Sequence, residues 1–143
     1  MAQSKKNALE QLSQLLATSM PSVTSGEIFS SLVERENLGS TALGHGVALP
    51  HGRLHGRDFA VGAFIKLQSG INFEAMDNEP VDLIYALLVP DHYTTEHLVI
   101  ISKLAQVFYD ETTRTQIRQC HNTNVLYNLL AEVSDRQSSP IKQ

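Results

Sequence analysis

VDLIYALLV, residues 81–89, is apolar at every position except Asp82. A strand that buries one face alternates apolar and polar residues, whereas a strand covered on both faces is apolar almost throughout. A similar run, FAVGAFIKL, occupies residues 59–67. We therefore predict two buried strands in the middle of the chain. The strand at 59–67 is broken by residues 68–70, and the strand at 81–89 is ended by Pro90.

Helical periodicity flanks these strands on both sides. Ahead of them, Ser4 is a suitable N-cap for a helix that ends near Ser19, and a capping box of Thr24 and Glu27 opens a second helix that stops at 37–39, where Asn and Gly suit a left-handed residue. After them, we predict a helix capped by Thr94 or Thr95 with an apolar face from Leu98 to Phe108, then helices at 111–119 and 124–133. The pattern predicts an α/β fold, with a mixed β-sheet sandwiched between helix pairs in a single domain.

Length and composition narrow the class of protein. The chain has 143 residues, 42% of them hydrophobic, which suits one domain with one core. Its net charge of -4 and scattered basic residues argue against nucleic-acid binding. No apolar run reaches the roughly 18 residues that span a bilayer, and residues 1–6 lack a secretion signal. The single cysteine, Cys120, has no partner for an internal disulfide, and we interpret it as a packing residue. We expect a soluble cytoplasmic protein without membrane insertion.

A glycine-rich stretch, GHGVALPHGRLHG at residues 44–56, is the candidate active site. It contains four glycines, three histidines and one proline. Because Pro50 fixes its own φ and favours an extended conformation at Leu49, we predict a short strand at 47–49 that leads His51 into a tight turn. Loops at strand ends are common places for catalytic groups.

Four side chains are candidates for phosphate chemistry. With an ordinary pKa of about 6.5, a neutral His51 ring offers one lone pair as a nucleophile, base or metal ligand. Arg35 and Arg53 carry guanidinium groups, which bind phosphate oxygens with paired donors. His97 falls in the first turn of its helix, beside backbone N–H groups that favour an anion. Each residue also has an alternative role without chemistry. His51 could be a turn histidine bound to a carbonyl, the two arginines could be solvated surface residues, and His97 could be a surface residue at a helix start.

Two further patterns in the same region suggest other ligands. His45, His51 and His55 could bind a metal, but the spacing of four suits a helix, which the glycines oppose, so no metal is predicted. GSTALG at residues 39–44 is similar to a phosphate-binding loop, but His45 stands where that loop requires lysine. We therefore expect no nucleotide and no other cofactor.

RENLGST at residues 35–41 and GHGVALPHG at residues 44–52 together resemble the active-site signature of enzyme IIA proteins of the bacterial phosphoenolpyruvate-dependent phosphotransferase system, in the mannitol/fructose type. Residues 77–83 and 86–90, and the start of the first helix at 3–6, are similar to the nitrogen-related branch of that family. The resemblance implies an enzyme IIA type-2 domain at residues 1–133, followed by a disordered tail at 134–143. Family members carry a further segment with a first strand before this helix, so we expect a truncated or divergent start.

The resemblance also implies roles for individual residues. His51 matches the histidine that is phosphorylated, as tele-phosphohistidine. His97 matches a second histidine that orients the phosphorylated ring, and Arg35 matches an arginine beside the phosphoryl group. Ser40, Thr41, Gly52 and Arg53 match positions near the phosphate or the partner protein, with Arg53 at a position where the family varies.

The function implied is that of a phosphocarrier with a mainly regulatory role. His51 would receive a phosphoryl group from an HPr-like phosphocarrier protein. Its phosphorylation state would then control binding to regulatory targets such as transporters or sensor kinases, in nitrogen metabolism and potassium transport. Two alternatives stay open: a sugar-uptake enzyme IIA that passes the phosphoryl group to an enzyme IIB domain, and a binding domain or metal-dependent hydrolase built on His45, His51 and His55.

Overall fold

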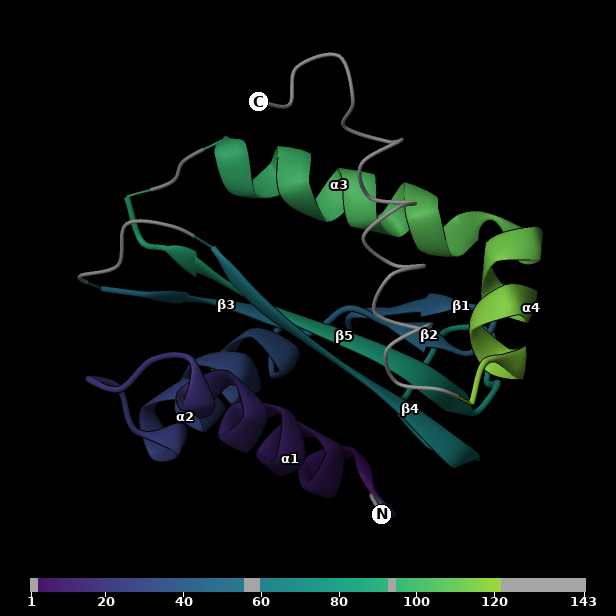
Figure 1. Ribbon diagram of the computed structural model, residues 1–143, viewed down its shortest axis with the longest axis horizontal. Helices are drawn as coiled ribbons and strands as arrows, with labels where there is room; N and C mark the ends of the chain where they lie inside the picture. The colour runs from purple at the N-terminus through teal and green to yellow at the C-terminus, as the bar shows by residue number, and fades with distance from the viewer. Residues whose placement is uncertain (1–2, 56–59, 93–94, 122–143) are drawn as a thin grey trace. The chain divides into compact units, whose positions relative to one another are not determined.

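The computed structural model describes residues 3–55, 60–92 and 95–121. In chain order its elements are α1 (Lys5–Thr18), α2 (Ser25–Glu36), β1 (Ala42–Gly44), β2 (Val47–Ala48), β3 (His51–Leu54), β4 (Val61–Ile71), β5 (Val81–Pro90), α3 (Glu96–Tyr109) and α4 (Glu111–Gln119) (Figure 1). The predicted helix at 124–133 and the tail at 134–143 lie outside the described residues. The chain divides into two compact units, Met1–Thr94 and Thr95–Gln143, which are described in turn.

The first two helices form as their capping residues predict. The Ser4 side chain accepts the N–H of Asn7, and α1 ends with Ser19 as its C-cap. Thr24 and Glu27 form both hydrogen bonds of the capping box that opens α2. At the end of α2, Asn37 keeps a right-handed conformation, and the positive φ of 150° falls on Gly39. The helix therefore ends through a glycine, as expected, but not through Asn37.

β5 is the strand on which the sheet is built. It pairs with β4 in antiparallel fashion and with β2 and β3 in parallel fashion, while β1 adds to β2 as an antiparallel neighbour. The register is the same in the two parallel pairs, since Ala48 lies opposite Ile84 and His51 opposite Leu87. β2 and β3 are therefore two halves of one line of chain along β5, interrupted at Leu49 and Pro50.

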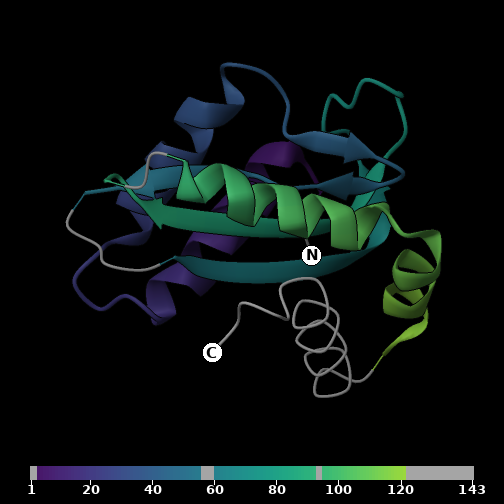
Figure 2. The same ribbon diagram turned by 90° about the horizontal axis from the view of Figure 1, so that it is seen from above.

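The core lies between this sheet and the first two helices. Figures 1 and 2 show α1 and α2 together on one face of the sheet. Alternate residues of the strands, among them Ala48, Ile84, Ala86 and Leu88, pack there against the apolar sides of the helices. The fold class is therefore α/β with a mixed sheet, as predicted. Helices on the second face of the sheet stay a prediction.

Three strand predictions need correction. Residues 68–70 do not end the first apolar strand, because β4 continues to Ile71 with a register shift after Lys66. β4 is also less buried than predicted, since most of its side chains are only partly covered. His51 does not lie in a turn: it begins β3, because the Pro50 carbonyl accepts the N–H of Leu87 and returns the chain to the ladder.

The second unit contains α3 and α4. Thr95 is the N-cap of α3 by position but makes no side-chain capping bond. Asp110, which the sequence did not single out, caps α4 by accepting the hydroxyl and the N–H of Thr113, and these bonds hold the pKa of the Asp110 carboxyl below its usual value. The buried Arg114 donates to the carbonyls of Phe108 and Tyr109 at the end of α3, where a positive charge is favourable.

At Gly52 the sheet packs tightly against α2. A Cβ at Gly52 would lie 3.1 Å from the backbone C and O of Ser31, and closer still to its hydroxyl, which donates to the Arg53 carbonyl. We expect Gly52→Ala to lower the free energy of unfolding by about 1–3 kcal/mol through overpacking. Gly26→Ala in α2, where a Cβ meets only one atom at 3.8 Å, should be neutral or stabilising. Urea denaturation of both variants checks this, and equal effects would contradict it.

Candidate functional site

His51 lies on the face of the sheet opposite α1 and α2. Its neighbour Gly52 faces Ser31 of α2, and Leu54 packs with the core on that same side. Because side chains alternate along a strand, His51 and Arg53 point the other way. The His51 ring is half-buried, and the Arg53 side chain is exposed.

One hydrogen bond sets the protonation of the His51 ring. Nδ1 lies 2.9 Å from the carbonyl oxygen of Leu49. A carbonyl only accepts, so Nδ1 must carry the proton, and in the neutral ring the lone pair is then on Nε2. The arrangement favours Nε2 as the nucleophilic atom.

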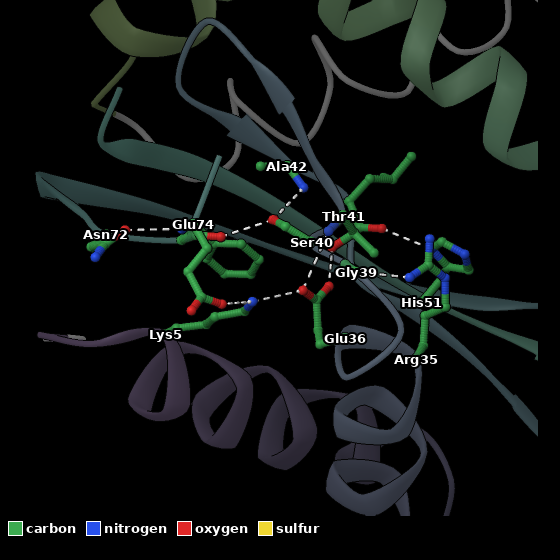
Figure 3. A network of polar contacts seen from close by, with 12 residues as sticks. Lys5, Arg35, Glu36, Gly39, Ser40, Thr41, Ala42, His51, Asn72 and Glu74 are labelled. Carbon is green, nitrogen blue, oxygen red and sulfur yellow. Dashed lines mark hydrogen bonds and ion pairs between the residues drawn. The ribbon is translucent and has the colours of Figure 1, made fainter. Parts of the chain in front are cut away.

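Arg35 occupies the last turn of α2, and its side chain extends toward the residues that follow the helix. Its Nη1 donates to the Gly39 carbonyl at 2.9 Å. The chain after Gly39 runs antiparallel to the chain before His51, since the Thr41 carbonyl accepts the Leu49 N–H at 3.0 Å. Figure 3 shows Arg35, Gly39 and His51 at the same end of one polar network. Arg35 and His51 thus lie in one region of the structure, and the joint action of the guanidinium and the ring on a phosphoryl group stays a prediction.

Ser40 and Thr41 have inward-facing hydroxyl groups. Ser40 Oγ donates to the Phe73 carbonyl at 2.8 Å and accepts the Ala42 N–H at 3.1 Å. Thr41 is buried, and its hydroxyl donates to the Glu36 carboxylate (Figure 3). Both side chains therefore serve the local structure here, and direct contact with a phosphoryl group stays a prediction.

Glu36 and Lys5 are the residues of this network that sequence reasoning missed. The Glu36 side chain is only 4% exposed and pairs with Lys5 Nζ at 3.0 Å, while Lys5 also pairs with Glu74 at 2.9 Å and lies over the Phe73 ring. Burial, the largest single influence, lowers the pKa of the Lys5 ammonium, but the hydrogen bonds and charges of Glu74 and Glu36 together raise it above its usual value. The sequence feature that could have pointed to Glu36 is its position between Arg35 and the glycine-rich stretch.

The turn from β1 to β2 is stabilised by Asp77, which lies 32 residues after His45 in the chain. Gly44, His45 and Gly46 all have positive φ, at 93°, 58° and 81°. The His45 N–H donates to Asp77 Oδ2 at 3.0 Å, and Asp77 Oδ1 accepts the Glu79 N–H at 3.0 Å. These two hydrogen bonds hold the pKa of the Asp77 carboxyl below its usual value of 3.8, and the bond from the Glu79 N–H has the larger effect. His45 therefore acts through its backbone in this turn.

His55 and Arg53 make contact with the loop after β5. His55 Nδ1 lies 2.7 Å from Asp91 Oδ2, and Arg53 Nη1 lies 3.4 Å from the Asp91 carbonyl. The three histidines of the glycine-rich stretch thus have different partners. Among the described residues, no group of three or more His, Cys, Asp or Glu side chains could hold a metal ion.

His97 lies in the first turn of α3, as predicted. It belongs to the second unit, so its approach to His51 stays a prediction. In the described part of the chain, every helix is too short or too polar to cross a membrane.

Comparison with known proteins gives a consistent family. Residues 1–133 match the family described as "Phosphoenolpyruvate-dependent sugar phosphotransferase system, EIIA 2". The nitrogen regulatory protein of Pseudomonas aeruginosa is 38% identical over 134 residues, which cover 94% of this chain and 87% of the relative. The crystal structure of nitrogen regulatory protein IIA-Ntr from Neisseria meningitidis has a TM-score of 0.83 at 40% identity, covering 90% of this chain and 88% of its own. A fructose-specific EIIA component of Haloferax volcanii is 32% identical, over 72% of this chain and 67% of its own length.

The chain therefore belongs to the EIIA type 2 family of the phosphoenolpyruvate-dependent sugar phosphotransferase system. Within that family it is similar to the nitrogen regulatory, IIA-Ntr-like proteins. The resemblance drawn from residues 35–41 and 44–52 is confirmed at the level of the family and of this branch.

The Leu49 contact predicts the tautomer of His51. In the neutral ring, nitrogen-15 NMR should show a protonated Nδ1 and an unprotonated Nε2, at a pH above the ordinary imidazole value of about 6.5. The exposed His121, outside the glycine-rich stretch, provides the comparison within the same spectrum. A His51 ring protonated mainly on Nε2 would contradict the geometry.

Asp77 predicts a stability that depends on pH. Because its folded pKa is lowered, the ionised carboxylate stabilises the fold above pH 3.8, and this contribution is lost as pH falls through the lower, folded pKa. Asp77→Asn cannot accept both N–H groups equally well, so it should be less stable than the parent at neutral pH. In urea denaturation the difference should shrink as the solution is acidified, and a difference independent of pH would argue against this role.

Proposed function

We propose that this chain is a phosphoryl-accepting regulatory protein of a nitrogen-related phosphotransferase system, with Nε2 of His51 as the acceptor. The observation that carries the proposal is the hydrogen bond from Nδ1 to the Leu49 carbonyl. It directs the lone pair to Nε2 in a histidine that follows the family's Ala-Leu-Pro motif. The similarity to nitrogen regulatory proteins supports the regulatory role.

The transfer step needs little chemistry from the protein beyond positioning and charge. The N–P bond on an HPr-like phosphocarrier breaks while a bond forms between phosphorus and Nε2 of His51. The electron pair of the broken bond returns to the carrier's ring nitrogen. Because phosphoryl transfer passes through a loose transition state with charge on its outer oxygens, correctly placed donors provide most of the catalysis. No cofactor is required, since the phosphoryl group arrives bonded to protein.

The residues around His51 suit this step. As Nε2 commits its lone pair to phosphorus, positive charge grows on the ring, and the Nδ1–H bond to the Leu49 carbonyl becomes stronger. Arg35, bound to the Gly39 carbonyl, supplies a guanidinium for the phosphoryl oxygens. Arg53 is exposed and would meet a partner protein at the surface, and His97 would complete the site if α3 brings it to the ring.

The output would be a change of charge at the surface. Phosphorylation adds about two negative charges, which is enough to alter which proteins bind. We propose that the free and phosphorylated forms bind regulatory targets differently, such as transporters or sensor kinases in nitrogen metabolism and potassium transport, within the cytoplasm.

Incubation with a phosphorylated HPr-like carrier tests the proposal. We expect one acid-labile, base-stable phosphate, carried on Nε2, and none in His51→Ala. His45→Ala and His55→Ala are matched controls, because each removes a histidine from the same stretch, and both should keep the label. Label that persists in His51→Ala would overturn the site, and an unlabelled parent chain would overturn the function.

A second function has specific support in the similarity to a fructose-specific EIIA component. In that case the phosphoryl group would pass from His51 to an enzyme IIB domain during sugar uptake. Loss of phosphate from His51 that requires both a IIB domain and its sugar would favour this alternative. Phosphate that remains on His51 under those conditions would favour the regulatory role.

A further inference from the structure

Thr41 and Leu49 lie opposite each other just beyond the pairing of β1 with β2. Ala42 pairs with Ala48, and the Leu49 N–H donates to the Thr41 carbonyl at 3.0 Å. In a regular antiparallel ladder, two residues that share one such bond share a second in the reverse direction. The regular partner of the Thr41 N–H would therefore be the Leu49 carbonyl.

The structure exchanges these partners. The Thr41 N–H donates to Glu36 Oε1 at 3.3 Å, and the Thr41 hydroxyl donates to Glu36 Oε2. The Leu49 carbonyl accepts Nδ1 of His51 at 2.9 Å instead. One carboxylate from the end of α2 thus takes the donor that the ladder would have given to the carbonyl beneath the imidazole.

We propose that Glu36 is a positioning residue for His51, which acts by holding the Thr41 N–H away from the Leu49 carbonyl so that this carbonyl can bind Nδ1–H. Lys5 supports it as the counter-ion of Glu36. The proposal deepens the proposed function, because it explains what keeps Nε2 as the phosphoryl acceptor.

A carboxylate is able to win this competition. Hydrogen bonds to an ionised acceptor are roughly twice as strong as those to a neutral carbonyl. A buried carboxylate would be unstable alone, and Lys5 Nζ compensates it at 3.0 Å. Lys5 also pairs with Glu74 at 2.9 Å (Figure 3). Its Nζ lies 4.9 Å from the centre of the Phe73 ring. The ion pair therefore fixes the charge and the place of Glu36.

The consequence for His51 concerns its two neutral tautomers. If the Thr41 N–H bound the Leu49 carbonyl, that oxygen would be shared between two donors, and its hold on Nδ1–H would weaken. The tautomer with the proton on Nε2 would then gain population, and it cannot attack phosphorus from that nitrogen. Loss of Glu36 should thus lower both the fraction of competent ring and the precision of its orientation.

Glu36→Met tests this, because methionine has a similar length and no strong acceptor. Groups that orient metal-binding histidines typically change affinity or activity by about 10- to 100-fold, and we expect a loss of similar size in phosphoryl transfer. The loss should be the same with phosphoramidate, a small donor that needs no docking. Nitrogen-15 NMR should show more His51 protonated on Nε2. Glu36→Gln keeps a neutral amide oxygen for the Thr41 N–H but loses the charge, so its rate and its tautomer population should fall between those of Glu36→Met and the parent.

Glu34→Met is the matched control, since it removes a carboxylate from the same helix at an exposed position. It should leave both rate and tautomer unchanged. Should Glu36→Met fail to fold, Lys5→Met carries the test, because it removes the counter-ion of Glu36, with the exposed Lys6→Met as its control. Lys5→Met should shift rate and tautomer in the same direction as Glu36→Met.

The proposal is overturned if the folded variant keeps the parent tautomer, whether its rate falls or not, since a merely structural role would not move the ring proton. It is also overturned if Glu34→Met has an equal effect. The NMR measurement uses unphosphorylated protein, so its outcome does not depend on the proposed function. Failure of the proposed function would instead appear as a parent chain that takes no phosphate at His51.

Discussion

The sheet depends on the pairing of β5 with one line of chain that is broken once. β2 and β3 share the same register on β5, and the break between them falls at Leu49 and Pro50. Proline has no N–H to give to a ladder. At this break the Leu49 carbonyl, which faces Thr41 on the side away from β5, does not bind the Thr41 N–H and instead accepts Nδ1 of the His51 ring. The interruption in the strand is thus the origin of the candidate site.

Packing on the opposite face keeps that break in place. Gly52 allows the backbone of α2 to approach at Ser31, whose hydroxyl binds the Arg53 carbonyl. On the other side of the break, Thr41 is tied to Glu36 at the end of the same helix. α2 therefore binds the chain before His51, at Thr41, and after it, at Arg53, and it also contributes Arg35. One helix carries a guanidinium, a carboxylate and the close contact that together define where the imidazole lies.

The sequence was most informative where one local signal was enough. Capping residues predicted α1 and α2, and an apolar run predicted β5. The clustering of His51 with glycines and Pro50 predicts the site, which stays a prediction. Predictions failed where the outcome depends on distant pairing. His51 was expected in a turn because its partner Leu87 is far along the chain, and β4 continued past Gly70 because pairing with β5 outweighs a weak local preference. Glu36 was missed for the same reason, since a charged helix residue is usually solvated.

The parallel pairing of β3 with β5 has a consequence for synthesis on the ribosome. Parallel strands require a long crossover, and such non-local contacts form late because the intervening loop must first be closed. Here the crossover contains β4, and the turn from β1 to β2 is held by a residue 32 positions away. A nascent chain that has already exposed Arg35, Glu36 and His51 therefore lacks an ordered site. The His51 ring reaches its place in the sheet, opposite Leu87, only when β5 has been made and has docked.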